Sequence, residues 1–160
     1  MGRADIELNE EGIAQCAILA REIDPDFEII YSSPLKRAYT TAQVIAKSTG
    51  KEIIICNELS ERDFGSLSGK TWDEINTETG KDLKQITKEQ RYDFRPYGGE
   101  SVEQVKERIE QFLNRVRTDG YSKVLIVCHS GIISLMRHMH EKEQLPSIPN
   151  ASVHEFVLEQ

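Results

Sequence analysis

The chain has 160 residues, 38% apolar and 29% charged, which suits one soluble globular domain over residues 1–160. Its formal net charge of −7 argues against general nucleic-acid binding, which needs a basic face to displace counterions from phosphates. No apolar run approaches the roughly 20 residues of a membrane span, and the first residues do not resemble a signal peptide. We therefore expect a cytoplasmic protein that binds neither nucleic acid nor a membrane.

The first part of the chain alternates helical and strand patterns. A helical pattern of apolar residues follows Asn9, and the run FEIIY at 27–31 predicts a strand. Ser33 can then cap a second helix, with Pro34 at its first position. The run IIIC at 53–56 predicts the next strand.

The middle of the chain, residues 58–99, is polar. It holds a short predicted helix near Trp72, followed by a less ordered stretch from Thr77 to Pro96. Ser101 and Gln104 have the spacing of a capping box, so they predict the start of a long helix. We expect one apolar face of this helix to lie in the core, formed by Val102, Val105, Ile109, Phe112 and Val116.

The last part of the chain continues the alternation. VLIVC at 124–128 predicts a short buried strand, IISLMRHMH at 132–140 a helix, and VHEFVL at 153–158 a final strand. Cys16, Cys56 and Cys128 form an odd set without paired spacing, which argues against a disulfide framework or a zinc site.

This alternation predicts the α/β class, with a largely parallel sheet between two layers of helices. Ligands in such folds bind outside the carboxyl ends of the strands. Arg37, Glu61 and His129 each follow a predicted strand. Arg37 also falls in the first turn of a predicted helix, whose positive N-terminal end attracts anions. We therefore expect a phosphate site at this edge of the sheet.

Four segments occur in one order along the chain: YSSPLKRAYTTA, LSERDFGSLSG, GGES and VLIVCHSG. Together they resemble the histidine phosphatase superfamily, also called phosphoglycerate-mutase-like, and the resemblance runs from Gly2 to about Leu158. It implies a phosphoglycerate-mutase-like three-layer fold and a hydrolase that attacks small phosphorylated substrates through a phosphohistidine intermediate. It implies no metal and no other cofactor.

The resemblance also implies roles for individual residues. Arg37 matches a phosphate-clamping arginine, Glu61 the proton donor, and His129 the second active-site histidine, which supports the charge of the transferring phosphoryl group. We expect a sheltered site to raise the pKa of Glu61, so that its carboxyl group can hold a proton. Further positions resemble those that contact substrate: Gly2, Arg62 and Ser130.

One family motif is missing. The family's chains begin with a strand that ends in Arg-His-Gly, whose histidine is the nucleophile, whereas here Arg3 is followed by Ala4. The chain therefore resembles a truncated family member that begins one strand late. Because that strand lies in the middle of the family's sheet, we expect a rearranged sheet, a strand lent by a second copy in a homodimer, or a separately supplied upstream segment.

These features predict a phosphomonoesterase-family domain that acts when the upstream nucleophile is present, whereas this chain alone is inactive. Its ligand would be a small phosphorylated substrate or inorganic phosphate. The alternative is a non-catalytic pseudophosphatase that binds a phosphorylated ligand or a protein. A phosphoglycerate mutase is less favoured, because the region between Glu61 and His129 is compact.

Overall fold

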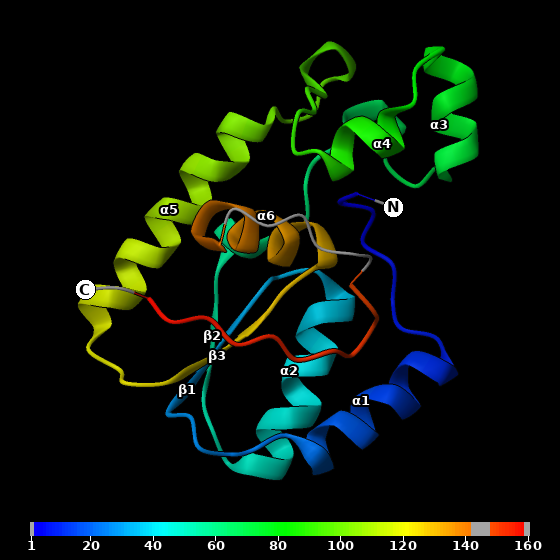
Figure 1. Cartoon of the computed structure of the whole chain (residues 1–160). Helices are drawn as coiled ribbons and strands as arrows, with labels where there is room; N and C mark the ends of the chain where they lie inside the picture. Colours follow the sequence, from blue (N-terminus) through cyan, green and yellow to red (C-terminus); the bar gives the residue numbers. More distant parts are fainter. Residues whose placement is uncertain (1, 142–147, 159–160) are drawn as a thin grey trace.

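The computed structural model describes residues 2–141 and 148–158 of the chain. Its sheet has three parallel strands in the order β2–β1–β3 (Figure 1). The strands are β1 (Ile29–Ser32), β2 (Ile53–Ile55) and β3 (Val124–Val127). In the central strand, Ile30 lies opposite Ile53 of β2 and Leu125 of β3. The predicted α/β class with a parallel sheet is confirmed.

Helices connect and flank these strands. The α-helices are α1 (Glu10–Glu22), α2 (Lys36–Thr49), α3 (Trp72–Thr79), α4 (Leu83–Lys88), α5 (Val102–Asp119) and α6 (Ser130–Glu141). Short 3₁₀ turns are η1 (Asn57–Leu59), η2 (Gly65–Leu67) and η3 (Arg95–Tyr97). Over the described residues, no helix combines the length and the apolar character that crossing a bilayer would require.

The helices cover both faces of the sheet, so the three-layer arrangement is confirmed. Side chains alternate between the faces of a strand, and β1 follows this rule. Ile30 packs against α1 and α2, in a cluster with residues such as Ala42. Ile29 and Tyr31 lie in the larger cluster with α5 and α6. Every residue of β1 is buried, as expected for a parallel strand between two helical layers.

Helix α5 begins and packs as predicted. The Ser101 hydroxyl accepts a hydrogen bond from Gln104 N, and the Gln104 side chain accepts one from Ser101 N, which completes the capping box. All five residues of the predicted apolar face are buried. Phe112 meets the ring of Tyr31 edge-on, with 5.4 Å between the ring centroids. Helix α5 therefore anchors the central strand from one face.

The polar middle of the chain is more ordered than predicted. The helix at Trp72 is confirmed, but it extends to Thr79, and α4 follows it. Side chains fix this connection: Asp82 caps α4 by accepting from Gln85 N, and Asn76 Oδ1 accepts from Leu83 N at 3.0 Å. These side-chain bonds to the backbone give order where a polar sequence predicts a loop.

The prediction of a final strand at 153–158 is wrong. This segment is extended, with Phe156 and Leu158 packed against the core while Val153 and Val157 are exposed. The alternation is that of a strand, but within residues 2–141 and 148–158 no backbone pairs with it. The predicted alternation is therefore present. The described residues contain no neighbouring strand with which this segment could form a sheet.

Strand β3 has a free edge for the same reason. It pairs with β1 on one side, and none of the described strands pairs with its other side. Its four apolar residues are only half-buried, whereas those of β1 are fully buried. The central strand expected from the family resemblance is therefore missing from the described sheet, which has not rearranged to replace it.

We predict that Ile109→Ala lowers the free energy of unfolding by about 2–5 kcal/mol, because Ile109 is fully buried in α5 and truncation leaves a cavity. The adjacent exposed position is the control, and Glu110→Ala should change stability by less than about 0.5 kcal/mol. Urea unfolding followed by circular dichroism measures both. Equal losses for the two variants would contradict this packing of α5.

Candidate active site

His129 and Ser33 meet beyond the ends of β3 and β1. His129 Nε2 lies 2.8 Å from Ser33 Oγ, and both residues are buried. Ser33 Oγ also accepts from Leu35 N at 3.3 Å. The prediction that Ser33 caps the helix is therefore wrong: α2 begins at Lys36, and the Ser33 hydroxyl serves the turn and the histidine.

The N-terminal segment covers the start of α2. Asp5 Oδ1 accepts from Lys36 N at 2.8 Å, so Asp5 takes the capping role that the sequence assigned to Ser33. Arg37 Nη1 donates to Ala4 O at 2.7 Å, and its Nη2 donates to Gly2 O at 3.0 Å. Gly2 is buried with a φ of +47°, a conformation that favours glycine. These bonds fix the guanidinium group and leave its other N–H groups for a further acceptor.

Glu61 lies against the first turn of α6. Its Oε1 accepts from Arg62 N at 2.9 Å, and its Oε2 accepts from Gly131 N at 3.2 Å. Arg62 Nε lies 3.5 Å from Glu61 Oε1. Both side chains are about 90% buried, so this is an ion pair largely shielded from water at the positive end of a helix. A Cβ atom at position 131 would lie 2.3 Å from Glu61 Oε1. The glycine therefore permits the contact.

The pKa of Glu61 is shifted in the direction opposite to the predicted one. Burial raises this pKa, but Arg62, His129 and the two backbone N–H groups together hold it below its ordinary value. The prediction took account of burial but not of the charged and hydrogen-bonding groups around the carboxylate. In the structure, Glu61 is therefore ionised at neutral pH.

His129 is neutral at pH 7. Burial lowers its pKa to about 4, Glu61 opposes this change, and the charges of Arg37 and Arg108 favour it. Burial also lowers the pKa of Arg37, while Glu61 raises it. Arg37, Glu61 and His129, which follow three different strands, therefore interact electrostatically, and the structure brings the three together as the sequence predicted.

The remaining predicted residues differ in their surroundings. Arg62 is buried, and its guanidinium carbon lies 5.0 Å from the ring centroid of Tyr92 and 5.8 Å from that of Phe64. Ser130 begins α6 with an exposed side chain. It takes no part in the described contacts of Glu61 or His129. Arg62 is thus part of the site, and Ser130 lies at its margin.

Sequence reasoning missed three residues behind the site: Arg3, Glu100 and Arg108. Their side chains form ion pairs that surround the backbone of Glu61. Glu100 belongs to the GGES motif, which contributed to the family resemblance. Within that motif, a role was predicted only for the neighbouring Ser101. Arg3 and Arg108 come from distant segments, and no local spacing relates them to Glu61.

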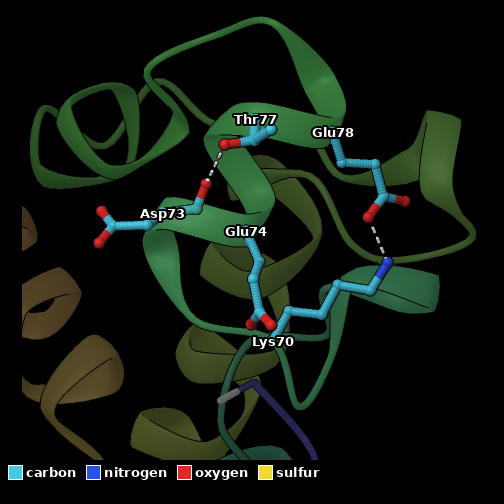
Figure 2. Close-up of a pocket in the computed structure, with 5 residues that line it drawn as sticks. All are labelled: Lys70, Asp73, Glu74, Thr77 and Glu78. Carbon is cyan, nitrogen blue, oxygen red and sulfur yellow. Dashed lines mark hydrogen bonds and ion pairs between the residues drawn. The ribbon is translucent and has the colours of Figure 1, made fainter.

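A surface pocket beside α3 is separate from these residues. It is lined by Lys70, Asp73, Glu74, Thr77 and Glu78 (Figure 2). Its charges serve local structure, because Glu78 pairs with Lys70 and Glu74 accepts from Thr71 N in a capping box. Over residues 2–141 and 148–158, no three His, Cys, Asp or Glu side chains cluster in a way that could hold a metal ion.

Several known proteins are similar to this chain in sequence and in fold. The sequence model of the histidine phosphatase superfamily (branch 1) matches residues 1–160. Phosphoserine phosphatase 1 of Hydrogenobacter thermophilus is 34% identical over 128 residues, which cover 79% of this chain and 60% of that protein. Phosphoglycerate mutase-like protein 4 of Arabidopsis thaliana is 31% identical over 98% of this chain and 71% of that protein. The chain thus spans 60% to 71% of the length of these two relatives.

Solved structures show the same similarity. A mycobacterial glucosyl-3-phosphoglycerate phosphatase superposes with a TM-score of 0.79 at 25% identity, covering 94% of this chain and 74% of that one. Structures of that phosphatase with inorganic phosphate and with VO3 match equally well. The phosphoglycerate-mutase-like fold is therefore confirmed.

We predict that Gly131→Ala destabilises the protein, because the new Cβ would lie within 2.6 Å of three side-chain atoms of Glu61 and Arg62. Alanine otherwise stabilises a helix by up to about 1 kcal/mol relative to glycine. Gly12 near the start of α1 is the matched control, since a Cβ there meets the flexible end of Leu8 at 3.0 Å. Thermal unfolding should show a lower Tm for G131A than for G12A. The reverse order would contradict the close approach.

The lowered pKa of His129 predicts a pH dependence of stability. Between its ordinary value of 6.5 and about 4, the unfolded chain binds a proton that the folded chain excludes. The free energy of unfolding should therefore fall as the pH decreases through this window. His129→Gln should lack this part of the slope between pH 6.5 and 5, where Glu61 stays ionised. Identical slopes in urea titrations of the two proteins would show that His129 titrates normally.

Proposed function

The chain belongs to the histidine phosphatase superfamily, and we propose that it carries most of the active site of a phosphomonoesterase acting through a phosphohistidine intermediate. The observation that best supports this is the meeting of Arg37, Glu61 and His129 beyond the carboxyl ends of three parallel strands. The names of the relatives point to small phosphorylated metabolites. We propose such a metabolite, or inorganic phosphate, as the ligand.

Arg37 would bind the phosphoryl group. Its guanidinium group is held by Gly2 O and Ala4 O on one side and keeps donors for phosphate oxygens, which a planar arginine fork suits well. His129 would contact the same group, and a hydrogen bond donated by its imidazole N–H to a phosphoryl oxygen would support the charge that develops in the transition state. Arg62 and Gly2 remain proposed substrate contacts, with Ser130 at the rim.

Glu61 would protonate the leaving oxygen. Although the surrounding protein groups lower its pKa, a phosphate dianion bound beside it would repel the carboxylate and raise that pKa. Binding of substrate would then drive uptake of the proton that the leaving group needs. In this proposal the cations that stabilise ionised Glu61 also bind the phosphoryl group when substrate is present.

The nucleophilic histidine would come from a strand outside this chain. The free edge of β3 lies next to His129 in sequence, and a parallel strand paired there would end beside Ser33 and His129. The alternating segment at 153–158, which pairs with none of the described strands, offers a second candidate neighbour for such a strand. An upstream segment could supply this strand together with its histidine, whereas a second copy of this chain could supply only a pairing strand. We therefore propose that the 160-residue chain alone does not turn over phosphate esters.

The first test is ligand binding. Orthovanadate at about ten times its Kd should raise the Tm of the chain by roughly 3–6 °C. Arg37→Ala should lose this shift, because it removes the proposed clamp. Arg21→Ala, which alters an exposed arginine of α1, should keep it. No shift in the unaltered chain would count against a phosphate site.

Turnover of p-nitrophenyl phosphate provides the complementary measurement. It should be undetectable with the 160-residue chain and appear when the chain is extended by a strand ending in Arg-His-Gly. Turnover by the 160-residue chain that His129→Ala abolishes would overturn the assignment of the nucleophile. Vanadate binding without turnover in the extended chain would favour the non-catalytic alternative.

A further inference from the structure

Glu100 joins three segments that meet behind the site. Its Oε1 accepts from Arg3 Nη2 at 2.8 Å and from Arg108 Nε at 3.0 Å. Its Oε2 accepts from Arg108 Nη2 at 3.1 Å and from Asp63 N at 3.0 Å. The Glu100 side chain is only 17% exposed. One carboxylate therefore links the N-terminal segment, the loop after β2 and helix α5.

Both arginines bound to Glu100 also hold the backbone of Glu61. Arg3 Nε donates to Glu61 O at 3.0 Å, and Arg108 Nη2 approaches the same oxygen at 3.4 Å. Arg108 Nη1 donates in addition to Glu58 O. Two cations thus converge on one carbonyl oxygen, and the carboxylate of Glu100 keeps both in place.

The held carbonyl group controls a hydrogen bond to the Glu61 side chain. A peptide unit is planar, so the orientation of Glu61 C=O sets the direction of Arg62 N–H on its other side. That N–H donates to Glu61 Oε1 at 2.9 Å. A continuous series of contacts therefore runs from Glu100 through Arg3 and Arg108 to the carboxyl group of Glu61.

We propose that Glu100 is a positioning residue that, through Arg3 and Arg108, fixes the peptide between Glu61 and Arg62 and thereby aims the Glu61 carboxyl group. Its importance for catalysis rests on the proposed function, in which Glu61 is the proton donor. A purely structural ion pair would stabilise the chain and leave the Glu61 carboxyl group unchanged.

The pKa of Glu61 separates these two roles, because two effects of Glu100→Gln have opposite signs. Loss of a nearby negative charge, by itself, lowers the pKa of Glu61. Loss of the bonds from Arg62 N and Gly131 N removes two influences that lower this pKa, and therefore raises it. The charges of Arg62 and Arg37 are the same in both cases, and so is the neighbouring imidazole of His129. Positioning therefore predicts an upward shift.

The experiment is a carboxyl ¹³C NMR titration of the 160-residue chain labelled at glutamate. Glu100→Gln should shift the pKa of Glu61 upward, and Arg108→Lys should do the same, because lysine keeps the charge but lacks the fork that reaches both partners. Glu110→Gln removes the same charge from the exposed face of α5, and it should leave the Glu61 titration unchanged.

An unchanged or lowered Glu61 pKa in folded E100Q would overturn the proposal. If E100Q does not fold, R108K decides by the same criterion. The outcome does not depend on turnover or on vanadate binding: failure of vanadate to bind would remove the proposed function, while an upward shift of Glu61 would still establish that Glu100 positions it.

Discussion

The ionised carboxylate of Glu61 is the constraint on which the rest of the site depends. A buried charge without partners costs several kcal/mol, so the surrounding residues must compensate for it. Arg62 and two backbone N–H groups do so, and Gly131 leaves the space they need. Arg62 in turn lies against the aromatic face of Tyr92, and His129 stays neutral. One carboxylate therefore dictates the identity of several neighbours.

Features determined by nearby residues could be predicted from the sequence. The cap of α1 at Asn9, the capping box and buried face of α5, and the three parallel strands all depend on local spacing and apolar period. The meeting of Arg37, Glu61 and His129 was also predictable, because the carboxyl ends of parallel strands share one edge of the sheet. In each case, the local pattern within and just after each element carries the information.

Features that depend on contacts between distant segments could not be predicted. Asp5 displaces Ser33 as the cap of α2 because the N-terminal segment folds back over that helix. The pKa of Glu61 follows from burial, from Arg62 beside it in the chain, and from His129 and Gly131, which a distant segment brings to it. The pattern at 153–158 correctly indicates an extended chain, but strand formation also requires a neighbour, which the pattern cannot supply.

The two borders of the sheet have a consequence for how this chain behaves in solution. Strand β2 ends the sheet on one side with Ile54 and Ile55 partly exposed, and β3 ends it on the other, where no strand of residues 2–141 or 148–158 pairs with its outer edge. Open edges of this kind can pair with those of other molecules. Net charge opposes such contacts, and at the sequence pI of about 5.2 this repulsion vanishes. Mild acidity should therefore make the sheet borders the starting points of aggregation.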